Sequence, residues 1–245
     1  MSLLNKFRVP QSRDSAARVV NGRDRGMGQP LHAPVVSTGV APSLRPGRYS
    51  NGLKEFLWQL EGTGRGQLLD LGPVSQATVN FFIERGFKVY TEDFLASWSV
   101  FLRAEDELLR SLPPGTDLPD FSPAARAERF LNSNLRHAPE SFDALLVWDM
   151  LDYLDRETMS HVVARLATMV RDRGAILAVF HARLPVGFQR YRVLDAHNLE
   201  LVPSSPLVQP LHIYQNREIQ NLFGGFRTSK TFVGRDQLRE GVFVK

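Results

Sequence analysis

The stretch QLLDLGPVSQAT at residues 67–78 decides the fold. A short apolar run ends at Asp70, Gly72 follows, and a helical pattern comes next. A second apolar run, FKVY at 87–90, is followed by Thr91, Glu92 and Asp93. A buried strand, a glycine turn, a helix and a second strand closed by acids form the front half of an α/β unit that binds nucleosides. The stretch therefore predicts both the fold class and the class of ligand.

The first part of the chain differs in composition from the rest. Residues 1–47 are rich in Gly, Pro, Ser and Arg and show no sustained apolar period, which predicts a flexible extension before a body at 48–245. An arm that orders on contact with a partner is the alternative. Residues 1–50 hold eight basic and two acidic residues, so the basicity of the chain belongs to this tail. Nucleic-acid binding is not expected, except weakly through the tail.

Composition also excludes several kinds of chemistry. The chain has no cysteine, which rules out disulfides, thiolate nucleophiles and Cys-ligated zinc, and its histidines have no metal-ligand spacing. No apolar run approaches the roughly 18–20 residues that cross a bilayer. Without a secretory signal the cytoplasm is the default location, and we expect no membrane partner. The sequence leaves the oligomeric state open.

The remaining apolar pattern alternates between strands and helices. Strands are predicted at 67–71, 87–91, 142–149 and 174–181, with a weaker third strand in FLNSNL at 130–135. Helices are predicted at 50–61, 75–85, 95–112, 123–131 and 156–172. A hairpin around Ala196-His197, a helix and a final strand pair complete the chain. This order predicts a three-layer α/β sandwich: a mostly parallel seven-stranded sheet with an antiparallel C-terminal strand and helices on both faces.

Five motifs in this order resemble the class I S-adenosylmethionine-dependent methyltransferases, over roughly residues 48–245. They are LLDLG (68–72), VYTEDF (89–94), FDALLVWDMLDYL (142–154), RDRGAILAVF (171–180) and YQNREIQNLFGGFRTSKTF (214–232). The resemblance implies S-adenosylmethionine as the cofactor.

The resemblance also implies a cofactor site. Gly72 would let the backbone pass close to the ligand, and the helix after it would aim its N-terminus at the methionyl carboxylate. Asp93, with Glu92 as its rival, would hold the ribose hydroxyls. Asp70 would either anchor the loop or touch the cofactor's amino group. The other implied contacts are Asn132 or Asn134 near the adenine and Trp148 near the methyl end.

Two residues are candidates for acid–base catalysis. Asp149 ends the 142–149 strand and would act as a general base, with a helix cap as the alternative role. His181 follows the 174–181 strand and would lie at the same end of the sheet. No Asn-Pro-Pro-Tyr motif follows the 142–149 strand, so the expected methyl acceptor is a small molecule or a protein rather than a nucleic-acid base.

Two other functions stay open. Val74 and Gln76 stand where such loops usually carry glycine, which favours a non-catalytic methyltransferase-like domain used for binding or assembly. The basic tail would then be its docking arm. A nicotinamide-dependent oxidoreductase is a third possibility, although that class needs the glycines more strictly.

Overall fold

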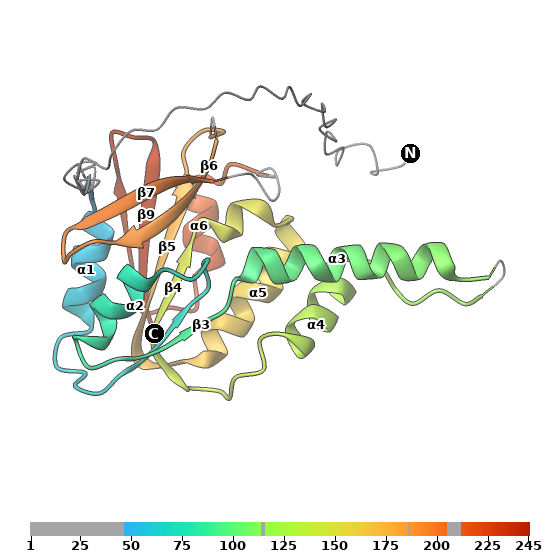
Figure 1. The fold of residues 1–245 in the computed structure, drawn as a ribbon, viewed down its shortest axis with the longest axis horizontal. Coiled ribbons are helices and arrows are strands. Elements are labelled where there is room, and N and C mark those ends of the chain that lie inside the picture. The colour runs from blue at the N-terminus through green and yellow to red at the C-terminus, as the bar shows by residue number, and fades with distance from the viewer. Residues whose placement is uncertain (1–46, 114–115, 186, 205–211) are drawn as a thin grey trace, which may run out of the picture. The chain divides into compact units, whose positions relative to one another are not determined.

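The computed structural model describes residues 47–113, 116–185, 187–204 and 212–245 (Figure 1). The predicted extension at 1–47 lies outside the described residues, apart from Gly47. No helix in the described part of the chain has both the length and the apolar character that a membrane span requires.

The central sheet has six strands in the order β3-β2-β4-β5-β9-β8. Their bounds are β2 Gln67–Asp70, β3 Lys88–Thr91, β4 Phe142–Trp148, β5 Val170–His181, β8 Thr228–Val233 and β9 Leu238–Val244. The strands β3, β2, β4 and β5 pair in parallel, whereas β9 is antiparallel to both of its neighbours. This confirms the mixed α/β class with a mostly parallel sheet.

The predicted count of seven strands is wrong for the described residues, because the segment at 130–135 does not form a strand. Residues 130–133 belong to the helix α4 (Pro123–Ser133). Ser122 caps this helix by accepting a hydrogen bond from Ala125 N, and Pro123 occupies its first turn. Phe130 and Leu131 are buried together with Ala127, at the spacing of one helical face.

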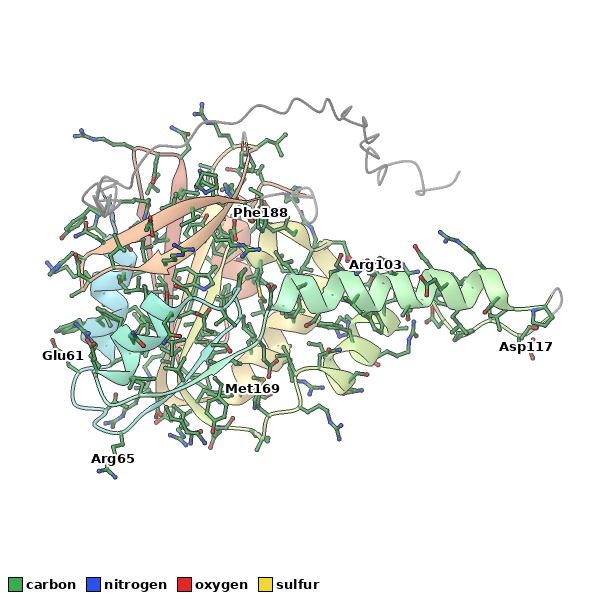
Figure 2. The ribbon with its side chains drawn as sticks, viewed as in Figure 1. Glu61, Arg65, Arg103, Asp117, Met169 and Phe188 are labelled. Atoms are coloured by element: carbon green, nitrogen blue, oxygen red, sulfur yellow. The ribbon has the colours of Figure 1, made fainter. Side chains whose placement is uncertain are left out.

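Two separate hydrophobic clusters cover the two faces of the sheet, because neighbouring residues of each strand point in opposite directions. Leu69 and Leu145 face a cluster that also contains side chains of α3 (Phe94–Ser111), α4, α5 (Arg156–Met169) and α6 (Asn216–Leu222). Leu68 and Ala144 face the other cluster, which includes α1 (Asn51–Gln59) and α2 (Gln76–Ile83). Figure 2 shows side chains between the sheet and the elements on both faces.

A small second sheet joins the α1–α2 side. It contains β1 (Arg48–Tyr49), β7 (Asn198–Ser204) and β6 (Phe188–Val193), all antiparallel, so the predicted hairpin is confirmed. Tyr191 and Val193 of β6 are buried in the same cluster as α2. The hairpin thus brings a strand that follows β5 toward the turn that follows β2.

The glycine-rich string at 62–66 connects α1 to β2. Gly62 and Gly64 have φ values of 82° and 67°, which glycine adopts without strain. In Figure 2 Glu61, next to this string, and Arg65, within it, lie far from Phe188, which lines the cavity described next. This connector therefore takes no part in the candidate site.

Candidate functional site

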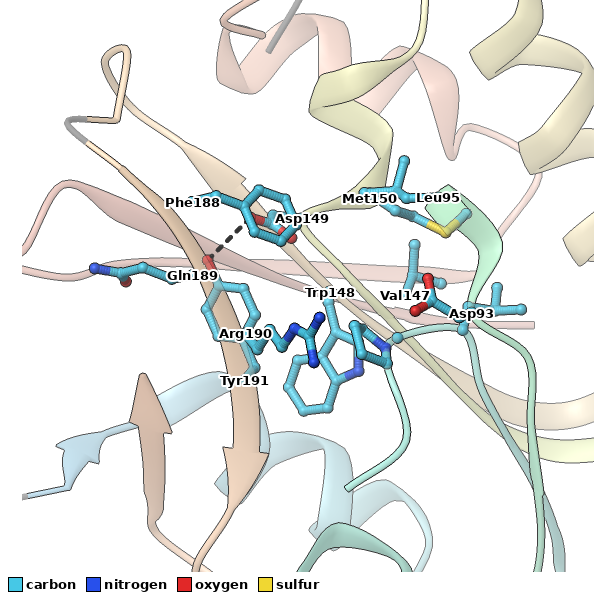
Figure 3. A pocket seen from close by; sticks show the side chains of 13 residues that line it. Asp93, Leu95, Val147, Trp148, Asp149, Met150, Phe188, Gln189, Arg190 and Tyr191 are labelled. Carbon is cyan, nitrogen blue, oxygen red and sulfur yellow. Dashed lines mark hydrogen bonds between the residues drawn. The ribbon is translucent and has the colours of Figure 1, made fainter. Parts of the chain in front are cut away.

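The carboxyl ends of β2, β3 and β4 meet around one cavity (Figure 3). From β2 the chain moves to β3 on one side and later to β4 on the other, so the strand order reverses here. Open α/β sheets bind their ligands at such a switch point. The residues that line the cavity include Gly72, Asp93, Trp148, Asp149 and, from the β6 strand, Tyr191.

Trp148 occupies the space above the glycine turn. A Cβ atom on Gly72 would lie 2.5 Å from Cδ1 and 2.8 Å from Nε1 of the indole, so only glycine fits beneath the ring. The indole Nε1 donates a hydrogen bond to Asp70 Oδ1 at 2.7 Å. The ring stacks on Tyr191 with centroids 5.5 Å apart and an interplanar angle of 4°. In this structure Gly72 therefore accommodates a side chain of the protein itself.

Asp70 anchors the turn, which is one of the two roles left open by the sequence. Its Oδ1 also accepts a hydrogen bond from Gly72 N at 3.0 Å. Burial raises the pKa of Asp70 to about 6, against the hydrogen bonds from Gly72 and Trp148, which lower it. Both of these hydrogen bonds stabilise the ionised carboxylate and thereby fix the turn and the indole together.

Val74 and Gln76 do not strain the loop. Neither residue has a positive φ, and the side chain of Val74 is 68% exposed, so it points away from the core. Gln76 Nε2 donates to Asn80 Oδ1 at 2.6 Å along α2. Ser75 accepts a hydrogen bond from Thr78 N and caps the helix. The conformation of this loop therefore requires no glycine at positions 74 and 76.

The structure separates Asp93, a candidate for the ribose, from Asn132, a candidate for the adenine. Asp93 lines the cavity and caps α3, since its Oδ1 accepts a hydrogen bond from Ala96 N at 3.1 Å. Glu92 Oε1 instead contacts His137 Nε2 at 2.5 Å. Asn132 is exposed on α4, where its Oδ1 accepts a hydrogen bond from Arg165 at 2.8 Å. Asp93 therefore lies at the cavity, whereas Asn132 does not.

Asp149 and His181 are brought together with an acid that the sequence reasoning missed. His181 Nδ1 lies 2.9 Å from Asp152 Oδ2, which also accepts a hydrogen bond from His181 N at 2.7 Å. His181 Nε2 lies 3.8 Å from Asp149 Oδ2. All three side chains are buried, and Asp152 Oδ1 has no partner among the described residues. The short 3-10 helix η2 (Met150–Tyr153) places Asp152 here, three residues after Asp149.

This cluster has perturbed protonation equilibria. Burial raises the pKa of Asp149 to about 7; the charge of Asp152 adds to this shift and the charge of His181 opposes it. Burial lowers the pKa of His181, but the hydrogen bond to Asp152 and the negative charges of both acids raise it above its ordinary value. Tyr153 and Tyr191 each place a hydroxyl 3.4 Å from Asp149 Oδ2. The cluster can hold or release a proton near neutral pH.

No protein family and no curated protein matches this sequence, whereas solved structures match its fold. One is the 1,6-didemethyltoxoflavin-N1-methyltransferase of Burkholderia thailandensis with bound 1,6-didemethyltoxoflavin and S-adenosylhomocysteine; it is 14% identical, and the match covers 79% of this chain and 76% of that one, with a TM-score of 0.42. Another is a SAM dependent methyltransferase from Aquifex aeolicus (8% identity, 78% and 88% coverage, TM-score 0.40). The glycopeptide N-methyltransferase MtfA complexed with S-adenosylmethionine is 16% identical (84% and 99% coverage, TM-score 0.37). Because these TM-scores are low, the case for a function rests on the residues of this chain.

The polar groups around the cavity fit S-adenosylmethionine, but the volume of the cavity does not. Asp93 is half-buried at the end of β3, and only its Oδ1 is engaged among the described residues. The glycine turn leads directly into the first turn of α2. The cavity itself, however, measures only about 20 Å³, which holds about one water molecule. A nucleoside does not fit into this volume unless side chains that line the cavity move.

Proposed function

We propose that this chain is an S-adenosylmethionine-dependent methyltransferase that acts on a small-molecule or protein acceptor. The observation that carries the proposal is the meeting of Gly72, Asp93 and Asp149, from three different strand ends, on one cavity at the switch point of the sheet. The five sequence motifs listed above, in family order, support the same activity.

Each of these residues has a defined part in the proposal. Bound S-adenosylmethionine would supply a methyl group whose carbon an acceptor atom attacks in line; the carbon–sulfur bond breaks and the thioether S-adenosylhomocysteine leaves. Asp93 would accept hydrogen bonds from the ribose, and the turn at Gly72 with the N-terminus of α2 would face the methionyl carboxylate. Asp149, whose pKa burial raises to about 7, would take the proton of the acceptor. His181, held by Asp152, would stabilise the ionised form of Asp149.

A second candidate function is a non-catalytic methyltransferase-like domain for binding or assembly. The packing of Trp148 between Gly72 and Tyr191 is consistent with it, because the ring fills the space above the glycine turn. The basic residues of 1–50 would provide the docking arm. Under this proposal neither S-adenosylmethionine nor S-adenosylhomocysteine binds.

Isothermal titration calorimetry with both ligands tests the proposal. We expect binding that Asp93→Ala weakens by about tenfold or more, the effect of losing charge-assisted hydrogen bonds. Asp172→Ala is the matched control, since Asp172 is 68% exposed and pairs with Arg227. Equal affinity of Asp93→Ala and wild type would contradict the proposed site. No binding to wild type or to the opened variant described below would contradict the function.

A further inference from the structure

Among the described non-glycine residues with a positive φ, Trp148 is the one that is buried. Its φ is 52°, in the left-handed region that bulky side chains rarely adopt. The other non-glycine residues with positive φ in the described ranges are all exposed: Glu140, Arg173 and Gln237. Backbone strain that persists in a buried position is characteristic of binding and switch sites. The surroundings of Trp148 must therefore offset the cost of this conformation.

Three contacts hold the indole of Trp148 in place. Asp70 accepts its N–H, Tyr191 stacks on its face, and Gly72 leaves room for its edge. Each contact comes from a different segment: the end of β2, the β6 strand and the turn before α2. Trp148 is only 4% exposed. Its ring therefore covers the point at the carboxyl ends of the strands where the strand order reverses.

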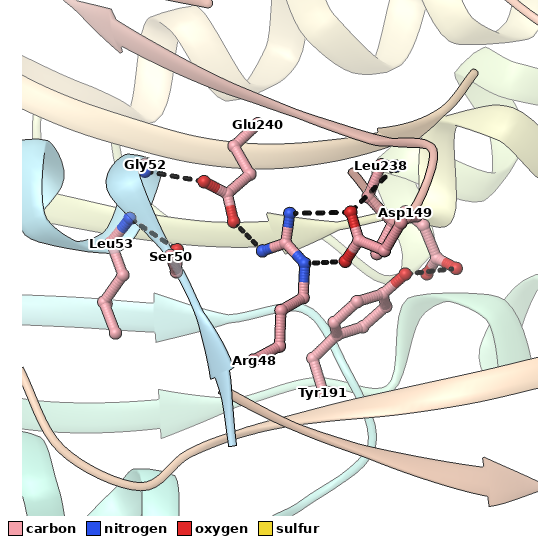
Figure 4. A network of polar contacts seen from close by, with 9 residues as sticks. Arg48, Ser50, Gly52, Leu53, Asp149, Tyr191, Leu238 and Glu240 are labelled. Atoms are coloured by element: carbon pink, nitrogen blue, oxygen red, sulfur yellow. Dashed lines mark hydrogen bonds and ion pairs between the residues drawn. The ribbon is translucent and has the colours of Figure 1, made fainter. Parts of the chain in front are cut away.

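Contacts of both strands of the β6–β7 hairpin hold Tyr191 of β6 in position. Val193 N donates a hydrogen bond to Thr78 Oγ1 of α2 at 3.0 Å. The partner strand β7 pairs with β1, whose Arg48 forms ion pairs with Asp236 and Glu240 (Figure 4). Glu240 also accepts a hydrogen bond from Gly52 N at 2.7 Å, which ties the start of α1 to β9. The hairpin therefore presents Tyr191 to the indole from a fixed position.

We infer that Trp148 occupies the place of the cofactor above Gly72, so that S-adenosylmethionine binds only after the indole leaves Asp70 and Tyr191. This inference rests on the proposed function and adds a state in which the side chain of Trp148 occupies the same site. Because only molecules with an open site can bind, the apparent affinity is the intrinsic affinity multiplied by the fraction of molecules that are open.

The test compares the affinity of S-adenosylhomocysteine for wild type, Trp148→Gly and Trp58→Ala by calorimetry. Glycine at position 148 removes the ring and suits a positive φ. Trp58 lies on α1, is 58% exposed and does not line the cavity, so its variant is the matched control. We expect Trp148→Gly to bind about tenfold or more tightly than wild type, the effect of opening a site that is at most about 10% open. The control should bind as wild type does.

The other outcomes separate the inference from the function. If wild type binds and Trp148→Gly binds equally or more weakly, the inference is overturned while the proposed function stands. If neither protein binds, although circular dichroism shows both to be folded, the function and the inference both fall.

Fluorescence provides a measurement that does not depend on the folding of Trp148→Gly. In the double variant Trp58→Phe/Trp98→Phe, Trp148 is the remaining tryptophan of the chain. Its emission should move to longer wavelength when S-adenosylhomocysteine saturates the protein, because the ring leaves a buried stack for a more polar environment. Saturation, established by calorimetry on the same variant, without a shift in emission would overturn the inference.

Discussion

Replacing Gly72 by alanine tests the contact on which this description of the site depends. The added Cβ would lie 2.5 Å from Cδ1 of Trp148 and 3.3 Å from Asp70 Oδ1. Gly72 does not have a positive φ, so the backbone tolerates alanine and any penalty comes from the clash with the ring. Overpacking of this kind costs about 1–3 kcal/mol. If the displaced indole also loses Asp70, a hydrogen bond to a charged group adds about 1.5–3 kcal/mol.

We therefore expect Gly72→Ala to lower the free energy of unfolding in urea denaturation by about 1–3 kcal/mol if the indole keeps Asp70, and by about 2.5–6 kcal/mol if it loses Asp70. Gly225→Ala is the matched control, because its Cβ would have no atom within 4 Å. A double-mutant cycle with Trp148→Ala should show that most of the penalty disappears when the ring is absent. A cost below about 0.5 kcal/mol, or the same cost with and without Trp148, would refute the proposed packing.

Three further predictions concern the fold and the buried acids. Ser122→Ala should lower the free energy of unfolding by about 1 kcal/mol, because it removes the cap of α4; no change in urea denaturation would question the helix. Thr78→Val should cost about 1–3 kcal/mol, since Val193 N loses its acceptor, and its amide should exchange faster with solvent; unchanged exchange would contradict this. Burial raises the pKa of Asp149 from 3.8 to about 7. Between these pH values the folded state therefore binds more protons than the unfolded state, and the contribution of Asp149 makes the free energy of unfolding fall as the pH rises. Asp149→Asn should flatten that fall in urea titrations between these pH values, and an unchanged slope would argue against the buried cluster.

The strongest sequence signals predicted the core of the fold. The nearly continuous apolar runs at 142–149 and 174–181 form the two central strands β4 and β5, which are covered on both faces. The turn at Gly72 and the acids after β3 are located as the pattern implied. These signals succeed because a strand buried on both sides needs apolar residues at every position.

The weaker signals failed where local patterns were ambiguous. The segment at 130–135 has apolar residues compatible with a strand, yet Phe130 and Leu131 complete a helical face that begins at Ala127. The helix predicted at 123–131 does form, and it continues to Ser133 through the residues assigned to the strand. Asp152 was missed because a 3-10 turn, rather than a strand end, carries it into the site.

The contact between Trp148 and Gly72 is beyond the reach of sequence patterns. It joins residues far apart in the chain and depends on a positive φ at Trp148, a conformation that a sequence pattern does not predict for a bulky residue. The sequence directed attention to Val74 and Gln76, whereas the structure shows that neither residue strains the loop. The structure instead shows Trp148 stacked on Tyr191, a residue far along the chain.

A crystal structure of the wild-type protein with S-adenosylhomocysteine is the most direct test of the central claim. We expect the ligand above Gly72 with its ribose against Asp93, and the ring of Trp148 moved away from Asp70 and Tyr191. A bound ligand elsewhere, or a ligand above Gly72 with the indole still hydrogen-bonded to Asp70, would contradict the account.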